Sequence, residues 1–215
     1  SALVQLGDRY AANPKDKAIS LKYASALQMD GRTDQSLAVM RKLVIYYLKD
    51  RDILAAYGKA LAADGQLEQA LDAIRRAETP EYPDWRLVSA EGAILDQIGK
   101  TDEARNLYRK ALDLKPNEPS VLSNLGMSYL LKGDLKTAET YLRSAVTQPG
   151  ADSRVRQNLA LVVGLQGRFD EAERIASAEL PPDQAAANVA YLRQMISQQN
   201  AWSQLKDNKK KKAVQ

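Results

Sequence analysis

The chain has 215 residues and a net charge of +4, and it contains neither Cys nor His. Without these two residue types there is no thiol or Ser–His catalysis and no usual zinc ligand, so we expect no metal, no cofactor and no enzymatic activity. Hydrophobic residues make up 45% and charged residues 27% of the chain, which suits a soluble helical protein with a substantial core.

A repeat with a period of 34 residues runs along the chain. Glycine recurs at this spacing in one column, which is Gly31, Gly65, Gly99, Gly133 and Gly167. Small residues recur in phase in two more columns, which are Ala24, Gly58, Gly92, Gly126 and Ala160, and Ser36, Ala70, Ala104, Ala138 and Ala172. Such regular columns predict a series of similar helix pairs.

Each column has a physical reason within a helix pair. The spaced glycine ends the first helix in a left-handed conformation, which glycine adopts without strain. The two small columns lie where the helices of a pair cross, and larger side chains there would cost about 1–3 kcal/mol by overpacking. Proline ends most second helices, as at Pro116 and Pro149.

The chain therefore predicts an all-α solenoid, which we divide in chain order. Residues 1–14 form the second helix of a truncated repeat, and residues 183–205 form a capping helix with a polar outer face. Residues 206–215 form a disordered lysine-rich tail, and its four consecutive lysines supply much of the net charge, so we expect no nucleic-acid partner. The five full repeats are 17–50, 51–84, 85–118, 119–152 and 153–186.

This pattern resembles the tetratricopeptide repeat (TPR) superfamily over nearly the whole chain. A narrower likeness lies in Arg156–Arg168 (RQNLALVVGLQGR) and Ala185–Arg193 (AAANVAYLR). These two segments are similar to TadD proteins, the TPR lipoproteins of the tight-adherence (Tad/Flp) pilus assembly system of Gram-negative bacteria.

The TadD resemblance implies a location and a role. It implies a periplasmic domain held at the outer membrane by a lipidated N-terminal Cys, which this chain lacks. It also implies a scaffold that helps a pilus secretin, or another pilus-assembly component, to assemble or reach its place. The alternative is a generic cytoplasmic TPR adaptor or cochaperone-like scaffold.

Residues of the first helices line the concave groove of a TPR array, and they are our candidate partner-binding residues. We expect a peptide or helix to dock with its apolar side chains on Met127, Leu131 and Leu161 and its backbone on Asn124 and Asn158. Two alternatives remain: the leucines pack under a neighbouring repeat, or the capping helix occupies the groove. The full candidate set is Arg86, Ser89, Ser123, Asn124, Met127, Leu131, Arg154, Gln157, Asn158 and Leu161.

Two further readings concern other partners. A carboxylate clamp of the chaperone-binding type requires several cations and amides, and only Asn124 and Arg154 match it, so we reject that function. Apolar residues of the first segment, Leu3, Leu6 and Tyr10, predict a homodimer if no other helix covers them.

Overall fold

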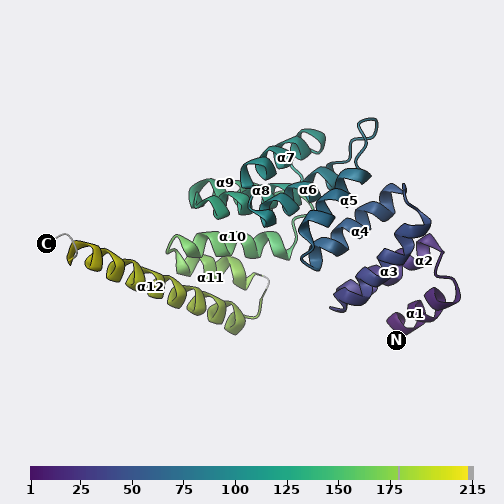
Figure 1. The fold of residues 1–215 in the computed structure, drawn as a ribbon. Coiled ribbons are helices and arrows are strands. Elements are labelled where there is room, and N and C mark those ends of the chain that lie inside the picture. Colours follow the sequence, from purple (N-terminus) through teal and green to yellow (C-terminus); the bar gives the residue numbers. More distant parts are fainter. Residues whose placement is uncertain (179, 213–215) are drawn as a thin grey trace. The chain divides into compact units, whose positions relative to one another are not determined.

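The computed structural model describes residues 1–178 and 180–212, with side chains as far as residue 198. Within these residues the chain forms twelve helices and no strand, which confirms the predicted all-α fold. The helices belong to two compact units, Ser1–Pro116 and Asn117–Gln215, called here the first and the second unit. Figure 1 shows the helices along the chain.

The first unit contains a single helix followed by three helix pairs. Helix α1 packs on α2, and the pairs are α2 with α3, α4 with α5, and α6 with α7. The helices are α1 (Ala2–Ala12), α2 (Lys17–Met29), α3 (Thr33–Tyr46), α4 (Arg51–Ala63), α5 (Leu67–Ala77), α6 (Trp85–Ile98) and α7 (Thr101–Leu114).

The second unit contains two helix pairs followed by one long helix. The pairs are α8 with α9 and α10 with α11, and the long helix packs on α11 and α10. The helices are α8 (Pro119–Lys132), α9 (Leu135–Val146), α10 (Ser153–Leu165), α11 (Phe169–Ser177) and α12 (Pro182–Lys212).

Several first helices begin at an aspartate that caps them or end at a glycine. Asp16 and Asp152 cap α2 and α10, and their carboxylates accept hydrogen bonds from the backbone N–H of Ile19 and Val155. Gly99 and Gly133 end α6 and α8 with φ angles of 98° and 86°. These left-handed values confirm the role predicted for the glycine column.

The small columns lie where the two helices of a pair meet. A Cβ atom added to Gly92 would lie 2.8 Å from Tyr108 Cε1, and one added to Gly126 would lie 2.9 Å from Leu142 Cγ. In the first pair, the buried Ser36 hydroxyl donates a hydrogen bond of 2.7 Å to the Ala24 carbonyl. The predicted close crossing of the helices is therefore confirmed.

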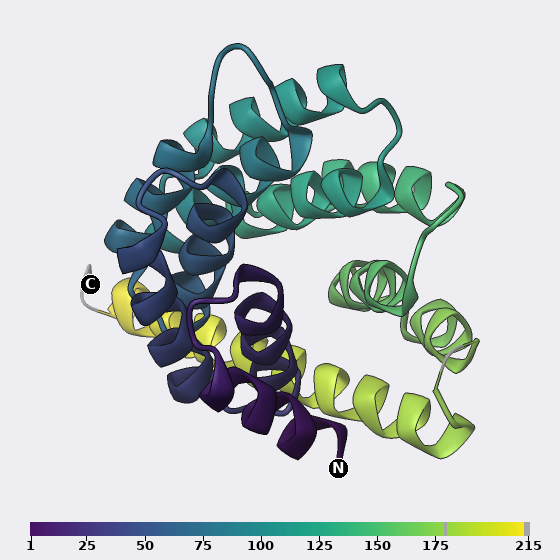
Figure 2. The same ribbon diagram turned by 90° about the vertical axis from the view of Figure 1, so that its right-hand side faces the viewer.

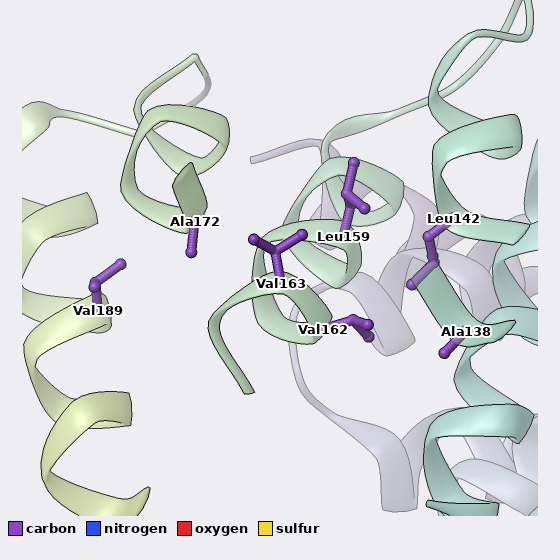
Figure 3. Close-up of a cluster of buried hydrophobic side chains, with 7 residues drawn as sticks. All are labelled: Ala138, Leu142, Leu159, Val162, Val163, Ala172 and Val189. Carbon is purple, nitrogen blue, oxygen red and sulfur yellow. The ribbon is translucent and has the colours of Figure 1, made fainter. Parts of the chain in front are cut away.

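The core of the second unit extends from α9 through α10 and α11 to α12. Figure 3 shows its side chains, with Val163 of α10 pointing toward Ala172 and Val189. The cluster consists of Ala138, Leu142, Leu159, Val162, Val163, Ala172 and Val189. Helix α12 is thus part of the packed interior and does not merely follow it.

Helix α12 differs from the expected cap and tail in its length. It continues to Lys212, so residues 206–212 are helical where the sequence analysis expects disorder; residues 213–215 lie outside the described residues. Figure 2 shows the helix continuing beyond the part that packs beside α11. A run of lysines near a helix C-terminus is compatible with the negative end of the helix dipole, which the composition rule for disorder ignores.

Helix α1 has no fully buried residue, but α2 partly covers it. Leu3, Leu6 and Tyr10 are half-buried, and the Tyr10 ring lies 5.1 Å from the ring of Tyr23. The apolar surface expected to drive dimerisation is thus partly used within the first unit.

Candidate protein-binding surface

The predicted partner-binding residues fall into two groups. Eight of them lie on the neighbouring helices α8 and α10 of the second unit, and Arg86 and Ser89 lie on α6 of the first unit. The eight are Ser123, Asn124, Met127 and Leu131 on α8, and Arg154, Gln157, Asn158 and Leu161 on α10. We call the side of α8 and α10 that bears these positions, together with the corresponding side of α12 described below, the first-helix face.

Three of the predicted polar residues have internal roles. Ser89 and Ser123 are buried, so neither offers an accessible hydroxyl. Asn158 donates a hydrogen bond of 3.0 Å from Nδ2 to Ser123 Oγ, which ties α10 to α8. This bond uses one of the two amide hydrogens of Asn158, and the residue is half-buried.

The predicted apolar anchors differ in exposure. Leu131 is 61% and Leu161 is 36% exposed, so these leucines do not pack under a neighbouring repeat. Met127 is half-buried and packs against the core cluster of the second unit. The exposed leucines are accessible to a partner, while Met127 also supports the fold.

Helix α12 adds residues that the sequence analysis missed. A four-residue motif recurs on the three helices, as Asn124-Leu125-Gly126-Met127, Asn158-Leu159-Ala160-Leu161 and Asn188-Val189-Ala190-Tyr191. Buried Ala185, Val189 and Leu192 follow the spacing of Val155, Leu159 and Val162. Helix α12 therefore stands in the place of a further first helix, although it comes earlier in the chain than the period of the repeat predicts.

Two rows of side chains result on the first-helix face. The asparagine row consists of Asn124, Asn158 and Asn188, and the apolar row consists of Met127, Leu161 and Tyr191. Exposure increases along the apolar row from half-buried Met127 to Tyr191, which is 64% exposed. Each of the three helices thus contributes one asparagine and one large apolar side chain.

A pocket of about 280 Å³ lies between α10 and α12, and we call it the α10–α12 pocket. Its walls are apolar apart from two amides, and they bear no charged side chain. One of these amides, Gln157, has a buried Nε2 atom that donates no hydrogen bond within the described residues. A buried donor without an acceptor costs about 1–3 kcal/mol. Leu161, Asn188, Tyr191 and Met195 form its accessible lining.

A group of ion pairs in the second unit lies between α9 and α11. Glu139 accepts hydrogen bonds from Arg143, Arg168 and Gln166, and Glu171 pairs with the same two arginines. Burial alone would raise the pKa of Glu139, but these hydrogen bonds outweigh it and hold the pKa below its ordinary value. We call these five residues the α9–α11 ion network.

The described residues contain neither a membrane-spanning helix nor a cluster of metal ligands. No helix in residues 1–178 and 180–212 has the length and hydrophobicity to cross a membrane. In the same part of the chain, no three acidic side chains lie close enough together to hold a metal ion.

Sequence comparison identifies the repeats. Models described as tetratricopeptide repeat match residues 21–84, 119–149 and 154–178, and one described as TPR repeat matches residues 92–133. Among curated proteins, none matches the chain significantly.

Three solved structures have a similar fold. The anaphase-promoting-complex hetero-tetramer Cut9–Hcn1 has a TM-score of 0.72 and 16% identity over 92% of this chain, which spans only 39% of the Cut9–Hcn1 chain. PilW, a type IV pilus biogenesis factor, has a TM-score of 0.71 and 18% identity, with 87% of this chain and 88% of PilW covered. PilF of Pseudomonas aeruginosa has a TM-score of 0.59 and 20% identity, with 80% and 78% covered.

Identities this low establish the fold alone, and TPR proteins in general are scaffolds for protein–protein interaction and not catalysts. The repeat models cover most of the chain from residue 21 to residue 178, and the helix pairs follow the repeat. The chain therefore belongs to the tetratricopeptide repeat family.

Proposed function

We propose that the first-helix face of the second unit binds a peptide segment of a protein partner. The observation that carries this proposal is the recurrence of an asparagine and a large apolar residue on α8, α10 and α12. An amide side chain can both donate to and accept from a peptide backbone, and an apolar neighbour can hold a peptide side chain. The two rows therefore offer both kinds of contact, with a spacing set by the repeat.

The α10–α12 pocket supplies the anchor of this surface. Its volume of about 280 Å³ is at the lower limit of ligand pockets and suits an apolar side chain.

The charges of the face favour an uncharged or acidic segment. None of the asparagine row, the apolar row and the pocket lining is acidic. Arg154 is exposed on the first turn of α10, and Arg156 and Arg193 each lie two residues from a member of these rows. A basic segment would gain no ion pair here and would approach Arg154 unfavourably.

Binding is tested with a triple variant, Leu161→Ala, Asn188→Ala and Tyr191→Ala. These side chains are exposed, so their removal should leave the fold intact. The matched control removes exposed apolar side chains elsewhere, with Ile45→Ala, Tyr82→Ala and Leu114→Ala. The probe is a peptide array in which one central residue varies between Leu, Phe, Ala, Glu and Lys. We expect apolar centres to bind best, with at least tenfold weaker binding by the triple variant alone.

We further propose that the partner belongs to a pilus assembly machine of the Tad/Flp type, in the periplasm and at the outer membrane. The support is the resemblance of Arg156–Arg168 and Ala185–Arg193 to TadD proteins. The fold shared with two pilus proteins is compatible with this role. These two TadD-like segments also carry most of the proposed binding surface, including Asn158, Leu161, Asn188 and Tyr191.

The role is tested by a pull-down from a Gram-negative envelope extract, with the parent protein, the triple variant and the control variant as baits. Recovery of a pilus secretin by the parent and control baits, but not by the triple variant, would support both proposals. Equal recovery by all three baits would keep the pilus role and reject this surface. Recovery of cytosolic proteins alone would reject the pilus role.

A further inference from the structure

The connection between α5 and α6 contains a buried pair of carboxyl groups. Residues 78–84 form this connection, which projects beyond the ends of the helices in Figure 2. Glu78 follows the last residue of α5 and is half-buried, and Glu91 lies in the middle of α6 with only 8% of its surface exposed. Glu91 acts on Glu78 through a side-chain hydrogen bond and through its charge, so two acidic groups meet at the joint between two helix pairs.

Arg75 is hydrogen-bonded to the pair, whereas Lys110 acts on it only through its charge. Arg75 of α5 donates a hydrogen bond of 2.9 Å from Nε to Glu91 Oε1. The Glu78 Oε1 atom is buried and accepts no hydrogen bond within the described residues. The hydroxyl of the next residue, Thr79, is also buried and has no hydrogen-bond partner there. Lys110 of α7 and Arg75 are the cations that act on Glu78, and Glu91 is the acid that acts on it. The simplest way to satisfy the pair is one proton shared between the two carboxyl groups.

The electrostatics agree with this geometry. Burial, and then the hydrogen bond and the charge of Glu91, raise the pKa of Glu78 to about 7, and the opposing effects of Lys110 and Arg75 are smaller. The chain contains no His and no Cys, so a shifted carboxyl group is the side chain that titrates near neutral pH.

The same connection is held at other points by contacts that do not involve Glu78 or Glu91. Arg51 of α4 donates hydrogen bonds to the carbonyl groups of Ala77 and Tyr82, and its guanidinium lies over the Tyr82 ring. Asp84 caps α6 through the backbone N–H of Arg86. The carboxyl pair is therefore the contact by which pH can change how tightly residues 78–84 are held.

We propose that Glu78 makes the α5–α6 joint a proton-sensitive hinge, closed when its protonated carboxyl group donates a hydrogen bond to Glu91 and loosened when Glu78 is ionised. This inference goes beyond the proposed binding function and does not depend on it. In the closed state the proton joins the end of α5 to the middle of α6. In the ionised state the charge of Glu78 lies beside Glu91 in a partly buried site, and Lys110 and Arg75 offset only part of the cost.

The raised pKa of Glu78 determines in which direction pH changes the opening of the joint. A carboxyl group whose pKa is raised on folding stabilises the closed joint fully below its ordinary pKa, and this stabilisation is lost as the pH rises toward the raised value. Opening should therefore increase from pH 5 to pH 8. Because Glu78 is only half-buried, solvent screening reduces the effect, and we expect roughly a tenfold increase in the opening constant.

The test is hydrogen exchange of the full chain between pH 5 and pH 8, corrected for the intrinsic exchange rate and read on peptides that cover residues 74–91. In the parent protein, protection should fall roughly tenfold over this range. Glu78→Gln keeps the shape of the protonated side chain, so its protection should be high and independent of pH. The control, Glu81→Gln, alters an exposed residue of the same connection and should keep the pH dependence of the parent.

Two results would overturn the hinge. One is protection in the parent protein that does not change with pH, and the other is a pH dependence that persists in Glu78→Gln. A titration of the Glu side-chain carboxyl carbons by NMR needs no variant. A midpoint for Glu78 at the ordinary value of a glutamate would also reject the proposal, whether or not the variant folds.

Discussion

The two units share one scaffold but differ in what their first helices present. In both units the small columns are buried, as at Ala70 and Ala104 in the first and Ala138 and Ala172 in the second. The candidate positions differ, because α4 carries Ala55 and Ala56 where α10 carries Gln157 and Asn158. The repeat thus separates residues that build the array from residues that are free to define a surface. These surface positions differ between helices, because α8 and α10 carry asparagines, whereas α2 carries Leu21, Gln28 and Met29.

The largest expected effect would break the scaffold of one unit at a time. Leu61 and Leu142 are fully buried in α4 and α9, so either Leu→Ala substitution should cost about 2–5 kcal/mol of unfolding free energy. Hydrogen exchange resolved by segment should show the loss in the first unit for Leu61→Ala and in the second for Leu142→Ala. An equal loss in both units from either substitution would mean that they unfold as one.

A smaller loss should follow from filling the helix crossings. Gly92→Val and Gly126→Val place a Cβ within 3 Å of Tyr108 and Leu142, so each should cost about 1–3 kcal/mol in urea unfolding. Ala63→Val, at an exposed site on α4, is the control and should stay within about 0.5 kcal/mol of the parent. If both glycine variants match this control, the crossings have room that the structure does not show.

The asparagine row can be divided into structural and free members. Asn158→Ala removes the hydrogen bond to buried Ser123 and should cost about 1 kcal/mol. Asn188 is exposed, so Asn188→Ala should change stability by less than about 0.5 kcal/mol while weakening peptide binding. Thermal unfolding and the peptide array, measured on the same two variants, separate the two roles. Equal destabilisation by both would contradict this division.

The smallest expected effect is the dependence of stability on pH and salt. For pH, its direction is opposite in the two units. The lowered pKa of Glu139 means that the α9–α11 ion network stabilises the second unit above the ordinary glutamate value of 4.5 and loses this contribution as the pH falls through the lowered value. Glu139→Gln should cost about 0.5–1 kcal/mol at low salt and almost nothing in 1 M NaCl, measured by urea unfolding. A cost independent of salt would assign the effect to packing. Acid should thus loosen the second unit, whereas alkali should loosen the α5–α6 joint of the first.

The helix-pair scaffold could be predicted from the sequence because the residues that indicate it recur at a fixed spacing. The glycine and small columns predicted the helix pairs, and they hold from Ala24 to Ala172. Helix α12 was understood only as a cap because its Asn188 motif lies out of phase with the period that identified the other repeats. The motif itself, asparagine followed three residues later by a large apolar residue, was present in the sequence and could have revealed the third helix of the surface.

Other features depend on distances between helices, which spacing does not encode. The burial of Ser123 and its bond to Asn158 arise from the approach of α8 to α10. The pairing of Glu78 with Glu91 likewise requires the connection between α5 and α6 to fold back on α6. Glutamates in a charged, helical sequence otherwise indicate solvated faces, so nothing in the pattern distinguishes these two.

The contacts between helices also have a mechanical consequence. Within the first unit, each helix touches only the helices next to it or next but one along the chain. A pulling force on the ends of this unit would pass through its joints one after another, as through springs in series, and the most compliant joint would extend first. With its shared proton removed, the α5–α6 joint would be that compliant element, so the stiffness of the array under load would depend on the acidity of its surroundings.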